Sequence, residues 1–167
     1  MTSIREIIGI DTRSVQRLTE AGVRTLDQLL EQGSTSTARM RLADETQLDD
    51  GNIKQWVHQA DLMRVNGIGP ELAHLLCQVG VFTAPKLAYR SSDSLYADLV
   101  DGNHTKHIMR RIPAAGELHE LITNAKRLPR RVRHYLRSTR ERMQRDTQRQ
   151  GQHFLRGQAF IAELVGH

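Results

Sequence analysis

The sequence is poor in aromatic residues and cysteine, and it has no long apolar run. Phe, Trp and Tyr make up 4% of the 167 residues, which argues against an aromatic-rich β-sandwich and against a nucleic-acid surface built on base stacking. The one cysteine, Cys77, cannot form an internal disulfide or a zinc cluster, and it points to a reducing compartment. No stretch approaches the roughly 20 apolar residues of a membrane span. Residues 1–20 carry charges throughout, unlike a signal peptide, so we expect a cytoplasmic protein with no membrane span.

The charges are divided unevenly along the chain. Residues 1–120 hold 13 Lys/Arg and 16 Asp/Glu, a net charge of −3. Residues 121–167 hold 11 Lys/Arg and 3 Asp/Glu, a net charge of +8. The excess positive charge therefore lies at the end of the chain, as expected for an acidic-to-neutral body with a basic arm that contacts a polyanion.

An internal repeat with a constant offset of 58 residues organises the sequence. Gly9-Ile10 matches Gly67-Ile68, and Gly22-Val23 matches Gly80-Val81. Further matched pairs are Leu18 with Leu76, Thr25 with Thr83, and Leu29 with Leu87. Residues 55–60 also resemble residues 120–125 if the second copy contains a short insertion. The repeat predicts two divergent copies of one unit, over residues 1–65 and 66–128, followed by an arm over residues 129–167.

Each copy is expected to be all-α, because no segment alternates polar and apolar residues for long enough to form a strand. In the first copy, Asp11 or Thr12 caps a helix that Gly22 ends. Thr25-Leu26-Asp27-Gln28 has the spacing of a capping box and predicts a second helix that ends near Gly33.

Two more helices are expected in the first copy, over residues 38–45 and 52–65, and the latter has its apolar residues along one stripe. Asp49-Asp50-Gly51-Asn52 has the composition of a turn and helix cap. The second copy repeats the plan, with Pro70 in a first helical turn, Gly80 at a helix end and Thr83 as a cap.

The strongest local motif is the turn Gly67-Ile68-Gly69-Pro70 between two helical patterns. Two glycines around one apolar residue permit a sharp turn, in which Ile68 is expected to point into the core. The backbone N–H groups of the turn and of the next helix start then face outward as a site for an anion. A small residue at Ala73 lets the two helices approach closely.

This motif resembles the helix-hairpin-helix motif, and the resemblance implies that Gly67, Ile68 and Gly69 hold a phosphate without reading base sequence. The paired hairpins, the Gly-Val after each hairpin helix and the stretch 56–65 resemble more specifically a bacterial family, domain of unknown function 4332. This resemblance covers about residues 4–127 and implies a fold of two tandem helix-hairpin-helix repeats.

Two positions depart from the DNA-binding pattern. Hairpins of that kind often carry Lys or Arg directly after the turn, where this sequence has Glu71, and a carboxylate beside a phosphate weakens binding. In the first copy, Asp11 replaces the second glycine and is expected to cap its own helix, which makes the first hairpin structural. For the second hairpin, a phosphate clamp and simple helix packing both remain open.

The arm reads as a basic helix that begins at Pro129. Arginines occupy much of its surface and suit phosphate oxygens. Those predicted to bind nucleic acid are Arg130, Arg131, Arg133, Arg137 and Arg140. The alternatives are a solvated helix held by a narrow apolar stripe, or a basic amphipathic helix on an anionic membrane. The apolar segment 154–165 is expected to fold back on the body, to bind a protein partner or to pair with another copy.

No constellation typical of an enzyme is visible. The sequence has no Gly-x-Ser-x-Gly, P-loop or dinucleotide-binding loop. His104 with His107, and His74 with Cys77, have helical spacing, but neither pair completes a metal site, so we expect no cofactor and no metal. The leading hypothesis is a non-catalytic, sequence-independent DNA- or RNA-binding protein. The main alternative is a protein-interaction or scaffold module with purely structural hairpins.

Overall fold

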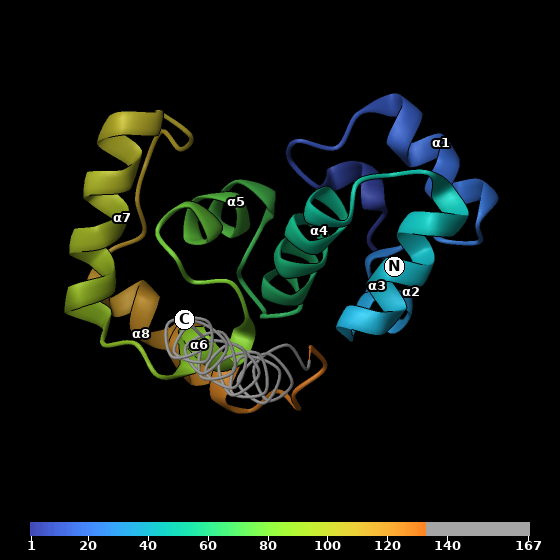
Figure 1. Cartoon of the computed structure of the whole chain (residues 1–167). Helices are drawn as coiled ribbons and strands as arrows, with labels where there is room; N and C mark the ends of the chain where they lie inside the picture. The colour runs from blue at the N-terminus through green and yellow to red at the C-terminus, as the bar shows by residue number, and fades with distance from the viewer. Residues whose placement is uncertain (133–167) are drawn as a thin grey trace, which may run out of the picture. The chain divides into compact units, whose positions relative to one another are not determined.

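The computed structural model describes residues 1–132, and this part of the chain is all-α, as predicted (Figure 1). It contains one 3-10 helix, η1, and eight α-helices. These are η1 (Ile4–Glu6), α1 (Thr12–Glu20), α2 (Leu26–Gly33), α3 (Ser36–Thr46), α4 (Asp50–Met63), α5 (Pro70–Gln78), α6 (Ala84–Ala88), α7 (Ser92–Lys106) and α8 (Ala115–Lys126). Within these residues the only β-type pairing is an isolated bridge between Ser3 and Thr25.

Side-chain caps determine where most of the helices begin. The Thr25 hydroxyl accepts from the backbone N–H of Gln28, and the Gln28 side chain accepts from the N–H of Thr25, which confirms the capping box. The side chains of Thr35 and Asp49 accept from the backbone N–H groups of Ala38 and Asn52 and so cap α3 and α4 with a single bond each. Both helices therefore start two residues before their predicted first residues, and α4 ends at Met63 rather than at residue 65.

Four glycines adopt backbone conformations that favour glycine. Gly22 and Gly80, with φ of +86° and +88°, follow α1 and α5 and stop them, as predicted. Gly9 and Gly67, with φ of +88° and +96°, lie in the turns that precede the same two helices. Each of these helices therefore lies between two turns that require positive φ.

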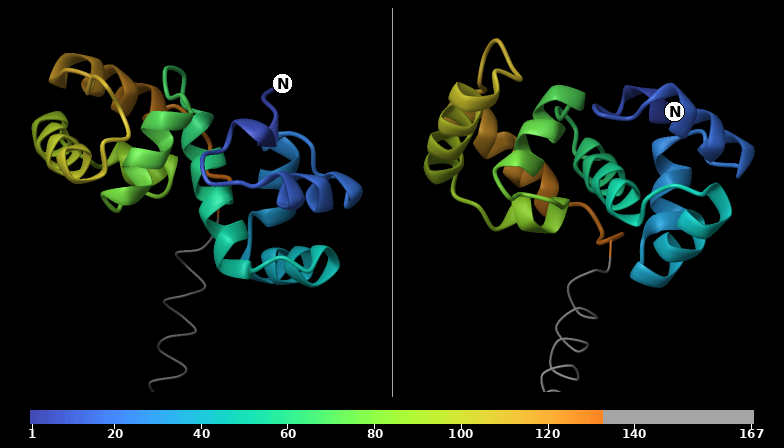
Figure 2. Two further views of the ribbon diagram at one scale, coloured as in Figure 1. Left: turned by 90° about the horizontal axis from the view of Figure 1, so that it is seen from above. Right: turned by 45° about the horizontal axis from the view of Figure 1, so that its top comes forward.

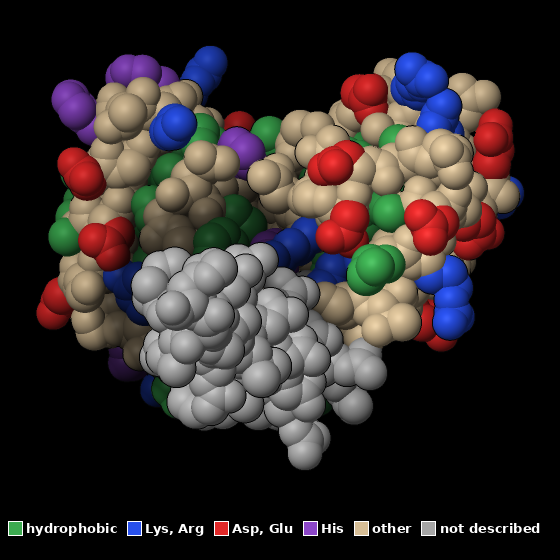
Figure 3. All heavy atoms as spheres, viewed as in Figure 1, with side chains coloured by type: hydrophobic (Ala, Val, Ile, Leu, Met, Phe, Trp, Pro, Cys, Tyr) green, Lys and Arg blue, Asp and Glu red, His purple; other side chains and the backbone are tan. Residues whose placement is uncertain are grey.

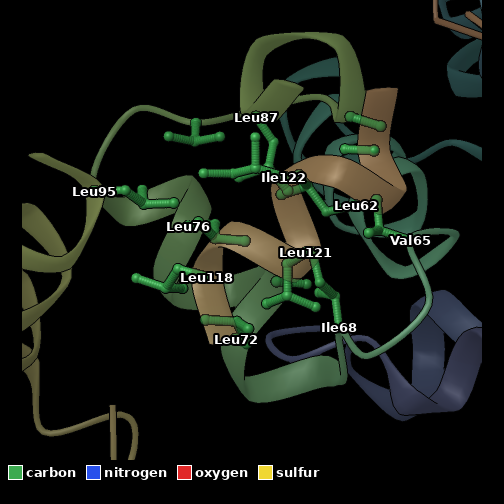
Figure 4. Packing of buried hydrophobic residues seen from close by; sticks show 14 of the residues in the cluster. Leu62, Val65, Ile68, Leu72, Leu76, Leu87, Leu95, Leu118, Leu121 and Ile122 are labelled. Carbon is green, nitrogen blue, oxygen red and sulfur yellow. The ribbon is translucent and has the colours of Figure 1, made fainter. Parts of the chain in front are cut away.

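The buried apolar residues form two clusters that share helix α4. The first cluster includes Leu18, Leu29 and Trp56, and the second includes Leu62 and Leu76. Helix α4 contributes its central residues to the first cluster and its last residues to the second. Accordingly, α4 lies between α1–α3 and α5–α8 (Figures 1 and 2). Figure 4 shows the second cluster, where side chains from α4, α5, α6, α7 and α8 converge.

The segment that follows α8 crosses from one cluster to the other. Leu128 packs against the second cluster, whereas Val132 is buried in the first. The expectation that Pro129 begins a helix is wrong, because residues 129–132 have no helical structure. Instead the Pro129 carbonyl accepts hydrogen bonds from Arg64, and the backbone continues until Val132 reaches the first cluster. We call residues 127–132 the exit segment.

None of the helices within residues 1–132 combines the length and the apolar composition that a membrane span needs.

Candidate nucleic-acid interface

The turn between α4 and α5 is stabilised by its own backbone and by α8. The N–H of Val65 donates to the carbonyl of Leu62, and the N–H of Ile68 donates to the carbonyl of Val65, both at 3.0 Å. As predicted, Ile68 is buried and points into the second cluster beside Leu121 (Figure 4). A Cβ at Gly67 would lie 2.7 Å from Leu121 Cδ2, so the turn also sits close against α8.

The start of α5 has no side-chain cap. Its N-cap residue, Gly69, has an extended backbone with φ −91° and ψ −179°, and Pro70 occupies the first turn, as predicted. By contrast, Ser, Thr or Asp side chains cap α1, α2, α3, α4, α6 and α7. Gly67 and Gly69 are exposed. Because Pro70 has no N–H, the first helical donors are the backbone N–H groups of Glu71 and Leu72, and no N-cap side chain supplies an oxygen to them. The helix dipole favours an anion there.

The corresponding start of α1 already holds an anion of its own. Asp11 has nearly the same backbone conformation as Gly69, with φ −89° and ψ 162°, and its Oδ1 lies 2.9 Å from the backbone N of Ser14. Hydrogen bonds from the side chain and the backbone N–H of Ser14 lower the pKa of the Asp11 carboxyl. The prediction that Asp11 caps its own helix is confirmed.

Glu71 is the main electrostatic obstacle to an anion at the second turn. It lies in the first turn of α5 and is exposed. A carboxylate there favours the helix start through the dipole, but it repels a phosphate. Ala73, two residues further along α5, is fully buried, and α5 packs against α4.

The predicted arginine contacts are only partly within the described residues. Arg130 is exposed, and Arg131 Nη1 lies 3.0 Å from Asp27 Oδ1 on α2. The remaining predicted positions, Arg133, Arg137 and Arg140, fall outside residues 1–132. The structure therefore places Arg131 beside the first cluster rather than at the Gly67–Gly69 turn.

Sequence reasoning missed a buried ion pair that connects the turn with the exit segment. Asp61 is fully buried, and its Oδ1 accepts from Arg64 Nε at 2.9 Å and Nη2 at 2.8 Å. Its other oxygen accepts from the backbone N–H of Ala84 at 2.8 Å, which supports the start of α6. Arg64 Nη1 and Nη2 both lie 3.1 Å from the Pro129 carbonyl. An acid and a base three residues apart at the apolar end of α4 were the only sequence signal.

His74 and Cys77 lie within helix α5, whereas His104 and His107 lie at the exposed end of α7. Burial lowers the pKa of His74 and raises the pKa of Cys77 to about 12, so Cys77 is a thiol at neutral pH. His104 and His107 are exposed, with ring centroids 6.4 Å apart. Within residues 1–132, no group of three or more His, Cys, Asp or Glu side chains is arranged to hold a metal ion.

These features define an all-α protein with an uncapped, exposed helix start after a glycine turn. The family model described as Domain of unknown function (DUF4332) matches residues 8–128, and the chain belongs to this family. No curated protein and no solved structure was found to match it.

Proposed function

We propose that this chain is a non-catalytic protein that binds nucleic acid, DNA in the first place, without reading its base sequence. The turn at Gly67-Ile68-Gly69 would hold one phosphate, and the arginine-rich segment from Arg130 onward would supply most of the affinity. The proposal depends on a fold of two tandem helix-hairpin-helix repeats followed by a basic arm.

The positions of helices and turns support the tandem repeat. Helices α1 and α5 have nine residues each and start 58 residues apart, and α2 and α6 start 58 residues apart as well. The four positive-φ glycines form two pairs with the same separation. The hydrogen bonds that close the turns after α1 and α5 also correspond, from the N–H of Val23 and of Val81 to the carbonyls of Leu18 and of Leu76.

A second correspondence concerns how each hairpin turn is fastened. Gln59 Nε2 on α4 donates to the Ile8 carbonyl at 3.0 Å, and Asn124 Nδ2 on α8 donates to the Asn66 carbonyl at 3.3 Å. In both cases an amide on the fourth helix holds the carbonyl directly before the hairpin glycine, Gly9 or Gly67. We infer that the two copies stabilise the hairpin turn by the same hydrogen-bonding arrangement.

The observation that carries the functional proposal is the contrast between the starts of α1 and α5. The backbone conformations at Asp11 and Gly69 are nearly the same, but only Asp11 supplies a carboxylate to the helix N–H groups. The second turn keeps the backbone geometry of an anion site and leaves it open to a ligand such as a phosphate. The first turn serves as structural support.

The test measures binding of a labelled duplex and a labelled single strand by fluorescence anisotropy, at low and moderate salt. The full chain is compared with a chain that ends at Val132, because Val132 belongs to the first cluster. Residues 133–167 contain seven arginines and three acidic residues. Their removal should abolish most of the binding and most of its dependence on salt.

The variant Gly69→Asp tests the turn itself. No atom lies within 4 Å of a Cβ added at Gly69, so the aspartate should cap α5 as Asp11 caps α1 and stabilise the fold by a few tenths of a kcal/mol. It should also weaken DNA binding by about fivefold, since its carboxylate takes the place of the phosphate. Gly69→Ser is the control, because serine caps without a charge. If Gly69→Asp binds as well as the wild type, the turn is only structural, and if the full chain binds neither duplex nor single strand, the proposal is wrong.

A protein-interaction module is the alternative, and one observation favours it. Tyr89 at the end of α6, and Tyr96 and Val100 on α7, are exposed to solvent. Binding through such residues would depend little on salt, unlike phosphate binding. The apolar segment 154–165, which was predicted to take part, lies outside the described residues.

A further inference from the structure

The end of α7 and the loop that follows it form a cationic surface that the sequence analysis did not connect with binding. Residues 102–116 contain Lys106, Arg110 and Arg111 and no acidic residue, within a body whose residues 1–120 carry a net charge of −3. His104 and His107 lie in the same stretch, and all five side chains are exposed. Figure 3 shows histidine and Lys or Arg side chains together at this end of α7. We call residues 104–111 the cationic loop.

The cationic loop is held in a defined conformation. Asn103 Nδ2 donates to the Met109 carbonyl, and the N–H of Met109 donates to Asn103 Oδ1, both at 2.8 Å. His107 ends α7 in the left-handed region, with φ +50°, and its N–H donates to the Asn103 carbonyl at 2.7 Å. Ile108 packs against the second cluster. Because these contacts hold the backbone, the points at which the Lys106 and Arg110 side chains leave the loop are defined, and both side chains are exposed to solvent.

Two of the three Lys and Arg side chains in the loop have no ion-pair or hydrogen-bond partner within residues 1–132. Arg111 pairs with Glu117, with Nη2 2.7 Å from Oε2. Within the described part of the chain, Lys106 and Arg110 form neither an ion pair nor a hydrogen bond through their side chains. Their positive charges are therefore available to a ligand.

The corresponding helix end in the first copy has the opposite charge. Helix α3 also ends in a left-handed residue, Gln47, with φ +56°. Its surroundings over the matching window, residues 42–56, contain four acidic residues and one cation, Lys54. There Arg17 of α1 donates to the carbonyls of Thr46 and Gln47 and offsets the negative end of the helix. The same backbone feature thus tolerates either sign of charge, so the fold alone does not require cations in the cationic loop.

We propose that the cationic loop is a second contact with the phosphate backbone of nucleic acid, made by Lys106 and Arg110 with the help of His104 and His107. This inference rests on the proposed function and adds a surface formed by residues 104–111 of the second copy. Exposed, unpaired cations on a well-defined backbone suit phosphate oxygens, and such contacts carry no base preference.

The test compares the full-length wild type with the double variant Lys106→Gln and Arg110→Gln. The matched control is the double variant Arg41→Gln and Lys54→Gln, which removes two exposed cations from the first copy. The probe is a short labelled DNA duplex, measured by fluorescence anisotropy over a series of salt concentrations. The loop variant should bind about tenfold more weakly, and the slope of log K against log salt should fall by roughly 2, whereas the control should keep the wild-type slope.

Each outcome separates this inference from the function on which it rests. Wild-type affinity in the loop variant, or an equal loss in both double variants, overturns the inference and leaves the proposed function standing. Failure of the wild type to bind the duplex overturns both.

Vesicles with and without phosphatidylserine complete the experiment. If the loop variant loses binding to the anionic vesicles but keeps its affinity for the duplex, the partner is a lipid surface and the inference is wrong. Thermal melts of all three proteins exclude a folding defect as the cause of a loss.

Discussion

Asp61 connects three distant parts of the chain through one buried carboxylate. It supports the first N–H of α6, and through Arg64 it holds the carbonyl of Pro129. A buried carboxylate is stable only when its oxygens are paired and hydrogen-bonded, and here both oxygens are. The sequence could not reveal this arrangement, because Ala84 lies 23 residues after Asp61 and Pro129 lies 65 residues after Arg64.

Asp11, in contrast, could be assigned from the sequence, because a helix cap is a local feature. Its partner lies only three residues away, and the preference of Asp for the N-cap position needs no information about the rest of the fold. Asp11 was therefore predicted correctly, whereas the structural role of Arg64 was not.

The Asp11 cap should make the stability of the protein depend on pH. The pKa of Asp11 is lower in the folded than in the unfolded chain. Its stabilising effect is therefore fully present above the ordinary value of 3.8 and is lost as the pH falls through the lower pKa of the folded state. Asp11→Ala should lower Tm at neutral pH, and this deficit should shrink below about pH 4. Thermal melts over a range of pH measure the effect.

The control for this prediction is Asp11→Asn, which keeps a capping oxygen without an ionisable group. It should show a smaller loss of Tm than Asp11→Ala at neutral pH. A deficit of Asp11→Ala that stays constant from neutral to acid pH would contradict the assignment of the effect to the ionised carboxylate.

At the scale of elements, short helices with caps and glycine stops were easier to predict than α7. Helix α2 follows a capping box, and Gly22 and Gly80 stop the helices before them, so their positions were clear in the sequence. Helix α7 has 15 residues but buries only Leu95 and Leu99, so it lacks the regular apolar stripe that identifies a helix. The helix predicted to begin at Pro129 was wrong for another reason. Proline is compatible with a first helical turn, but Pro129 and Val132 make tertiary contacts in a non-helical exit segment instead.

Replacing each of the two glycines in the turn before α5 by alanine should change the stability of the protein by very different amounts. Gly67→Ala places a side chain at φ +96° and close to Leu121, and it should lower the free energy of unfolding by about 1–2 kcal/mol. Gly69→Ala adds a Cβ at an extended backbone with open space around it, and it should change stability by less than about 0.5 kcal/mol. Urea unfolding measures both variants, and equal losses would mean that the turn is not constrained at Gly67.

At the scale of the molecule, the division of the charge and the 58-residue offset can be read from the sequence, but the packing of α1–α3 and α5–α8 on α4 cannot. Hydrophobic periodicity indicates that one side of α4 is buried. It does not indicate that the two ends of α4 serve different clusters, because that depends on which helices pack beside each end. For the same reason, the sequence suggested that the body ends near residue 128, whereas Val132 still belongs to it.

Truncation should locate the true end of the body. A chain that ends at Ala125 lacks Leu128 and Val132 and leaves Arg64 without the Pro129 carbonyl, so it should be about 2–3 kcal/mol less stable than a chain that ends at Val132. Urea unfolding followed by the fluorescence of Trp56, the only tryptophan, reports on the cluster that Val132 enters. If the two truncated chains have equal stability, the exit segment does not contribute to the body.

The sharing of α4 has a consequence for how the folded state opens. Trp56 and Leu62 lie on one helix but in different clusters, so neither cluster can come apart without exposing one end of a helix that the other cluster needs. We therefore expect local fluctuations to be confined to the outer helices. We also expect the amide hydrogens of α4 to exchange with solvent only through unfolding of residues 1–132 as a whole, so that their exchange rate would report the global stability of this part of the chain.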